Sequence, residues 1–167
     1  MDKDTLFYKK QTIVCSGKIV DLSLPVVMGI LNVTPDSFYD GGKHVDKGSI
    51  VKNAKQIVND GATIIDVGGM STRPGAEEVT CDEEIKRLSF ALETIREILP
   101  DTVISVDTFR AKVASTVIEK YKVDIINDIS GGKIDPEIID VVSSASVPYI
   151  TMHMQGTPQN MQKNPQY

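Results

Sequence analysis

Apolar positions follow two different spacings along the chain, and the two spacings alternate. Consecutive apolar positions are typical of a strand buried on both faces, whereas apolar positions three or four apart indicate an amphipathic helix. The consecutive type occurs at Val26–Leu31, Thr63–Val67, Val103–Asp107, Asp124–Asp128 and Pro148–His153. Strands and helices in repeated succession predict a parallel sheet with right-handed crossovers.

Four helices are predicted, one between each pair of successive strands. Their apolar positions are Ile50, Ala54, Ile57 and Val58 in the first, Ile85, Leu88, Leu92, Ile95 and Leu99 in the second, Val113, Val117, Ile118 and Tyr121 in the third, and Ile138, Ile139 and Val142 in the fourth. Gly61 stands where a C-terminal cap belongs, and Thr80 with Glu83 forms a capping-box pattern. Asp135 and Pro136 are predicted to be the N-cap and first-turn proline of the last helix.

The segment before the first strand predicts a β-hairpin. Two β-branched runs flank Ser16 and Gly17 within the sequence TIVCSGKIVDL, and such a pattern favours a tight turn between paired strands. No linker is visible, so a single domain is expected, with the hairpin in residues 1–24 and five strand-helix units in residues 25–167. Two architectures fit: an open doubly wound sheet, or part of a (β/α)8 barrel.

Polar side chains stand at the ends of the predicted strands. They are Asn32, Asp66, Asp107 with Thr108, Asn127 with Asp128, and His153. In both architectures the carboxyl ends of the strands hold the chemistry, so these residues predict a functional site. The competing interpretation is that each one caps the helix or turn that follows it.

Composition and charge exclude several classes of function. The 167 residues carry a formal net charge of -5 without a basic block, so neither a nucleic-acid surface nor an anionic-membrane surface is expected. The apolar runs are far shorter than the ~20 residues that span a bilayer. The N-terminus has no apolar core of a secretory signal. Cys15 and Cys81 lack metal-binding spacing and are expected to be reduced, so a cytoplasmic protein is predicted.

Five segments together resemble one enzyme family. MGILNVTPDSFYDGG and DVGGMSTRPGAEEV resemble the two signature segments of dihydropteroate synthases. SVDTFRAKVA, INDISGG and TMHMQGTPQNMQ resemble the next three strand ends of that family, in the same order. The resemblance implies a (β/α)8 TIM barrel, of which this chain contains about five β/α units. It also implies a transferase of folate biosynthesis, the target of sulfonamides. The enzyme joins para-aminobenzoate to 6-hydroxymethyl-7,8-dihydropterin pyrophosphate, with assistance from Mg²⁺.

The resemblance assigns roles at the strand ends. Asp107 and Asn127 would bind the donors of the pterin, and Ile129 and Met152 would face its flat ring. Asn32 would be an oxygen ligand near the Mg²⁺ and the pyrophosphate, as a hard cation requires.

Two loops receive roles from the same resemblance. Phe38 and Asp40 belong to the first loop. Thr72, Arg73 and Pro74 belong to the second, which encloses para-aminobenzoate together with the first. Arg73 and Asp40 are expected to be catalytic, in addition to Asp107 and Asn127. On the residues alone, Arg73 could equally pair with a neighbouring glutamate on a solvated loop.

The length departs from the family pattern. A TIM barrel usually needs ~250 residues and at least 200, and the motifs that the family carries after its sixth, seventh and eighth strands are absent. The chain is therefore expected to be an N-terminal portion that is inactive alone and forms a homodimer when full length. A methyltetrahydrofolate-type methyltransferase domain and a non-catalytic pterin-binding fragment are the alternatives.

Overall fold

The computed structural model describes residues 11–34, 46–70 and 79–156, and two sheets are present in these ranges. The smaller is an antiparallel hairpin of β1 (Thr12–Cys15) and β2 (Lys18–Asp21). The larger contains β3 (Met28–Asn32), β4 (Ile64–Gly68), β5 (Val103–Asp107), β6 (Ile125–Asp128) and β7 (Tyr149–Thr151). The helices are α2 (Lys47–Asn59), α3 (Cys81–Ile98), α4 (Ala111–Tyr121) and α5 (Glu137–Ala145). The predicted elements are thus confirmed.

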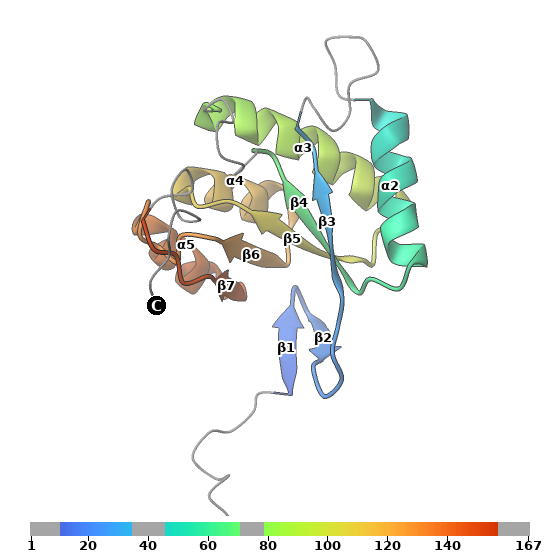
Figure 1. Cartoon of the computed structure of the whole chain (residues 1–167), viewed down its shortest axis with the longest axis horizontal. Coiled ribbons are helices and arrows are strands. Elements are labelled where there is room, and N and C mark those ends of the chain that lie inside the picture. Colours follow the sequence, from blue (N-terminus) through green and yellow to red (C-terminus); the bar gives the residue numbers. More distant parts are fainter. Residues whose placement is uncertain (1–10, 35–45, 71–78, 157–167) are drawn as a thin grey trace, which may run out of the picture.

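The larger sheet has the strand arrangement of a barrel. Its strands are all parallel and lie in sequence order, β3-β4-β5-β6-β7. The helices pack on one side of this sheet, as Figure 1 shows. A doubly wound sheet would reverse its strand order at a switch point and carry helices on both faces. The described part of the chain therefore has the fold of a partial TIM barrel.

The outer face of the sheet holds the main hydrophobic core. Leu31, Val67, Ile104, Val106 and Ile126 are buried there between the strands and the helices. Because side chains alternate along a strand, their neighbours in sequence point to the opposite, inner face. The inner face consequently carries the residues that differ most from an ordinary core.

Register divides the inner face into three tiers. The tier nearest the strand starts contains Met28, Ile64 and Val103, the middle tier contains Ile30, Asp66, Ser105 and Ile125, and the tier at the carboxyl ends contains Asn32, Gly68, Asp107, Asn127 and Ile150. The hairpin lies beside the strand starts in Figure 1 and packs Cys15 and Val20 against that end. One end of the inner face is thus closed by apolar side chains.

The first strand of the sheet differs from its prediction. Its apolar run predicts burial on both faces, but Ile30 is 67% exposed. Within the described residues, β3 has a neighbour on one edge only, β4. The hairpin cluster reaches Met28 at the start of the strand and does not include Ile30. The prediction of a strand from this apolar run is therefore confirmed, but the prediction that the side chain of Ile30 is buried is wrong.

Local signals set most helix ends. The side chain of Thr80 accepts a hydrogen bond from the Glu83 backbone N–H at 3.2 Å, as the capping pattern predicts. Gly61, at φ +100°, follows α2 and completes its C-cap. The predicted N-cap Asp135 is wrong for α5. Its carboxylate accepts from the Ala111 backbone N–H at 2.7 Å and so caps α4, because tertiary packing brings that helix start beside it.

Gly29 permits close contact between β3 and α2. A Cβ atom there would collide with the side chain of Ile57. We expect Gly29→Ala to lower the free energy of unfolding by about 1–3 kcal/mol through overpacking. Urea denaturation followed by circular dichroism measures this change. Gly48→Ala is the control, because Gly48 is an exposed residue in the first turn of α2. A loss of stability that is equal in both variants would contradict the steric explanation.

No helix in the described ranges has both the length and the apolar character needed to cross a membrane. Cys15, which is buried, and Cys81, which is half-buried, are not joined in a disulfide.

Candidate functional site

The carboxyl-end tier brings three predicted residues into one row. Asn32 on β3, Asp107 on β5 and Asn127 on β6 occupy the same register position, with Gly68 of β4 between Asn32 and Asp107. A Cβ atom on Gly68 would lie 2.7 Å from Oδ1 of Asn32 and 3.9 Å from Cβ of Asp107. The absence of a side chain at Gly68 therefore leaves room between the amide and the carboxylate.

Asp107 is the acid of this row, and its pKa is perturbed. Burial, followed by the negative charges of Asp66, Glu84 and Asp128, raises its pKa from the ordinary value of 3.8 to about 7. None of the hydrogen bonds among the described residues uses the Asp107 carboxylate. A half-buried acid with a raised pKa at a strand end is typical of a functional site, because a purely structural carboxylate is normally hydrogen-bonded or paired.

Asn127 is held by an acid from the tier below. Its Nδ2 donates to Oδ2 of Asp66 at 3.0 Å, across the 61 residues that separate the two in sequence. Asp66 is only 4% exposed, and its Oδ1 has no hydrogen-bond partner within the described residues. The sequence placed Asp66 among the polar strand-end residues but assigned it no individual role. The available signal was an acid inside the apolar run TIIDV.

Two other polar strand ends do not join the row. Asp128 is fully buried and accepts hydrogen bonds from the backbone N–H groups of Ser130 and Gly132 and from the Tyr149 hydroxyl at 2.6 Å. It organises the turn after β6. Burial, followed by the hydrogen bond to Asp128 and its negative charge, raises the pKa of Tyr149 above its usual range. His153 is exposed beyond β7. Asp128 therefore binds the turn that follows it, as the capping interpretation predicts.

Apolar residues border the row on the side of β7. Ile150 is in register with Asn127, and the Met152 backbone N–H donates to the Asp128 carbonyl at 3.2 Å, which joins the two strand ends. Met152 is 39% exposed and Ile129 is half-buried. The structure places these residues close to the row. Their contact with a flat ring stays a prediction.

The remaining predicted residues lie outside the described ranges. These are Phe38, Asp40, Thr72, Arg73 and Pro74. Their assigned roles stay predictions.

Two arginines hold the residues on either side of positions 71–78. Arg87 donates to the Gly69 carbonyl at 3.3 Å, and Arg110 donates to the Val79 carbonyl at 2.7 Å. Arg110 also pairs with the buried carboxylate of Glu84 at 2.6 Å. Burial nevertheless raises the pKa of Glu84. The negative charge of Glu84 in turn contributes to the raised pKa of Asp107.

The row can supply one protein ligand to a magnesium ion, the amide oxygen of Asn32. No group of three or more His, Cys, Asp or Glu residues that could hold a metal occurs in the part of the chain that the structure describes. Asn32 offers an exposed amide oxygen beside the space above Gly68. Since Mg²⁺ commonly takes one or two protein oxygens and completes its shell with phosphates and water, this donor set fits.

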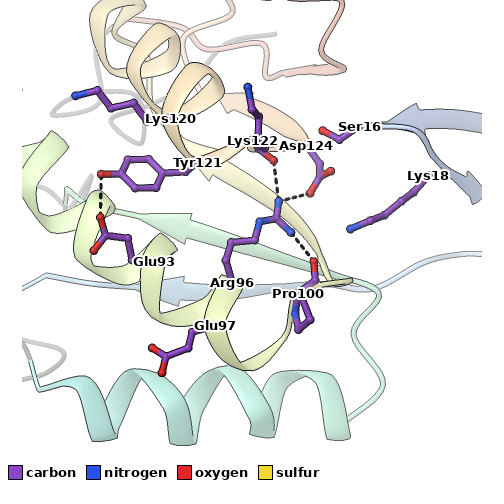
Figure 2. Close-up of a pocket in the computed structure, with 10 residues that line it drawn as sticks. All are labelled: Ser16, Lys18, Glu93, Arg96, Glu97, Pro100, Lys120, Tyr121, Lys122 and Asp124. Carbon is purple, nitrogen blue, oxygen red and sulfur yellow. Dashed lines mark hydrogen bonds and ion pairs between the residues drawn. The ribbon is translucent and has the colours of Figure 1, made fainter.

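A second hollow lies at the opposite end of the sheet, near the strand starts, and has a volume of about 790 Å³. Figure 2 shows Arg96 at its centre. The guanidinium donates to Oδ2 of Asp124 at 2.7 Å, to the Thr102 carbonyl at 2.7 Å and to the Lys122 carbonyl at 2.8 Å. These bonds join the ends of α3 and α4 to the starts of β5 and β6. The polar residues of this hollow therefore have a structural role, and the row at the carboxyl ends is the candidate site.

Comparisons with known proteins show the family of the chain. Residues 28–167 match the family described as pterin binding enzymes. The dihydropteroate synthase of Escherichia coli K12 is 48% identical over 153 residues, which are 90% of this chain and 52% of that protein. The Yersinia pestis dihydropteroate synthase, solved with a sulfonamide drug complex, has a TM-score of 0.80 at 40% identity and covers 93% of this chain and 55% of its own.

A further similar structure was solved with 7,8-dihydropteroate bound. Burkholderia cenocepacia dihydropteroate synthase, complexed with 7,8-dihydropteroate, has a TM-score of 0.75 at 34% identity, covering 93% of this chain and 51% of its own. The chain thus spans about half the length of these relatives. The methyltransferase alternative gains no support from them.

Proposed function

The chain belongs to the family of pterin binding enzymes, and we propose that it carries the pterin-binding residues of a dihydropteroate synthase. The enzyme would condense 6-hydroxymethyl-7,8-dihydropterin pyrophosphate with para-aminobenzoate to give 7,8-dihydropteroate and pyrophosphate. The observation that carries the proposal is the row of Asp107 and Asn127, a half-buried carboxylate with a raised pKa beside an amide in register. The ligands named for the Yersinia and Burkholderia relatives support the same substrates and sulfonamide binding.

The residues suit a reaction through a cation. Breaking the bond between the methylene carbon and the pyrophosphate leaves positive charge on the pterin. The neutral amine of para-aminobenzoate then attacks the methylene carbon and loses a proton. Asp66 and Asp107 would stabilise the cation electrostatically while Asn127 fixes the ring, so positioning and charge supply the catalysis without a protein nucleophile. A Mg²⁺ ion held in part by Asn32 would offset charge on the leaving pyrophosphate.

The roles of the loop residues Phe38, Asp40, Thr72, Arg73 and Pro74 belong to the same proposal. They would enclose para-aminobenzoate over the row. The homodimer and the cytoplasmic location stay predictions.

Asp107→Asn tests the proposal in the full-length protein. We expect pterin affinity to fall about 10-fold to 150-fold, because a hydrogen bond to a charged acceptor contributes ~1.5–3 kcal/mol. Calorimetry with 6-hydroxymethylpterin measures the change, and dihydropteroate formation measures the activity. Asp140→Asn, an exposed acid on α5, is the control and should leave both unchanged. Unaltered pterin affinity in Asp107→Asn would remove Asp107 from the site.

The raised pKa of Asp107 predicts two opposite pH effects. The charged carboxylate is the better acceptor, so pterin affinity should fall as the pH falls through about 7. For folding, the native state holds this proton at pH values where the unfolded chain has released it. The contribution to stability is therefore present at acidic pH and lost as the pH rises from about 4 to about 7.

Asp107→Asn should remove this loss, so that the variant is stabilised at pH 8 relative to the unsubstituted protein while it binds pterin less well. Urea denaturation at pH 5 and pH 8 measures the effect. Equal stability differences at the two pH values would contradict the assignment of the titrating group to Asp107.

A further inference from the structure

Asp66 is a buried acid that the proposed reaction uses only as a charge, yet its geometry is specific. It lies in the middle tier, 4% exposed, with one oxygen bound to the Asn127 amide and the other without a partner among the described residues. The neighbouring Ser105 is in register with it. A charged group in such a place needs a compensating role, because burying an unpaired acid is costly.

The contact with Asp66 fixes the orientation of the Asn127 amide. An ionised carboxylate only accepts hydrogen bonds, so the NH₂ end of the amide must face Asp66. The reversed amide would set oxygen against oxygen and lose the bond at 3.0 Å. Asn127 therefore retains one acceptor, Oδ1, and one further N–H donor, in a fixed order. No other hydrogen bond from this side chain occurs in the ranges that the structure describes.

A fixed donor and acceptor order can select between ligands. The edge of a pterin presents an acceptor, N1, next to a donor, the 2-amino group. An analogue with oxygen at position 2 presents the reverse order, because N1 carries hydrogen and the oxygen accepts. A freely turning amide can match either edge, whereas a held amide matches one. A site built to pair a polar group rejects an analogue that leaves it unpaired.

We propose that Asp66 is a positioning residue that holds the Asn127 amide in one orientation and thereby makes the site select a 2-amino pterin over its 2-oxo analogue. The inference rests on the proposed function, because it assumes that the ligand beside Asn127 is a pterin. Asp66 itself makes no contact with the ligand in this role. Its effect on the choice between the two ligands passes through Asn127.

The test compares 6-hydroxymethylpterin with 6-hydroxymethyllumazine, its 2-oxo analogue, by calorimetry on the full-length protein. The quantity measured is the ratio of the two affinities. In Asp66→Asn the partner of Asn127 can donate as well as accept, so the Asn127 amide can turn. We expect the ratio to fall about tenfold, the effect of one mispaired hydrogen bond. Ser105→Ala is the matched control, since it removes an equally buried polar group from the same tier without touching Asn127.

A second readout separates positioning from general support of the fold. The charge of Asp66 raises the pKa of Asp107, together with burial and the charges of Glu84 on α3 and Asp128 on β6. Asp66→Asn should therefore move the midpoint of pterin binding to lower pH. Asn127→Ala should also reduce the affinity ratio, and adding Asp66→Asn to it should reduce the ratio no further. Asn127→Ala keeps the inference testable if Asp66→Asn fails to fold, because an unchanged affinity ratio in Asn127→Ala would overturn it.

The outcomes are distinct. A reduced ratio in Asp66→Asn and in Asn127→Ala, with an unchanged ratio in Ser105→Ala, supports the inference. An equal loss of affinity for both ligands in Asp66→Asn overturns it and leaves the proposed function standing. An unchanged ratio in Asn127→Ala overturns it as well. If the unsubstituted protein binds neither ligand and forms no dihydropteroate, the proposed function fails, and the inference fails with it.

Discussion

A polypeptide limited to residues 1–167 is expected to form no measurable dihydropteroate, at least several orders of magnitude below a complete synthase. Within the described residues β3 and β7 are edge strands, and the inner face is open enough to leave Ile30 67% exposed. Unpaired edges and uncovered apolar surface favour association over a closed pocket. At ~1.4 kcal/mol per tenfold in rate, two missing charge-assisted contacts in the transition state already remove orders of magnitude.

The assay follows dihydropteroate from para-aminobenzoate and the pterin pyrophosphate, using protein freed of host synthase. The complete Escherichia coli synthase is the positive control, and size-exclusion chromatography reports association. Turnover within tenfold of that control would show that residues 1–167 suffice for the reaction. The prediction that activity requires the complete barrel would then be wrong.

Arg96→Met is expected to lower the free energy of unfolding by about 3–5 kcal/mol, the cost of leaving a buried charge without its partner. Asp124 is 1% exposed and relies on the guanidinium of Arg96 at 2.7 Å, in addition to the Ile104 backbone N–H at 2.9 Å. The same guanidinium binds the carbonyls of Thr102 and Lys122. One substitution thus releases the ends of two helices and two strands together.

Lys47→Met is the matched control, because it breaks another ion pair to α3. Lys47 and Glu97 are 2.6 Å apart, but their side chains are 53% and 63% exposed, so the loss should be about 0–1 kcal/mol. Adding Asp124→Asn to Arg96→Met should recover part of the stability, since the amide can still accept from Ile104 and carries no charge. Urea denaturation gives all three values. Similar losses in Arg96→Met and Lys47→Met would show that burial of the pair is unimportant.

Local patterns were sufficient for the elements and most of their ends. Apolar runs predicted the strands of the barrel sheet, and Thr80 and Gly61 marked helix ends through interactions within a few residues of themselves. These features depend on sequence neighbours, which the sequence displays directly. Asp135 shows the limit of such reasoning, because its carboxylate caps a helix 24 residues away instead of its own.

The division between site and support could not be read from residue type. Asp107 and Asp128 are both acids at strand ends, but Asp107 belongs to the inner row whereas Asp128 binds the turn after its own strand. The face on which a strand residue points depends on register with neighbours far away in sequence. The hold of Asp66 on Asn127 has the same origin, since 61 residues separate them. For the loop residues near Arg73, the resemblance alone supplies the expectation.

The bare backbone at Gly68 has a consequence for resistance to inhibitors. Any substitution there adds a Cβ atom 2.7 Å from Oδ1 of Asn32, which must then move away from the position proposed for contact with the metal and pyrophosphate. An inhibitor that contacts Gly68 would bind a surface to which no mutation can add a side chain without displacing Asn32 and so disturbing the reaction. Escape from such a compound should therefore arise at other positions, and a selection experiment should recover few or no changes at Gly68.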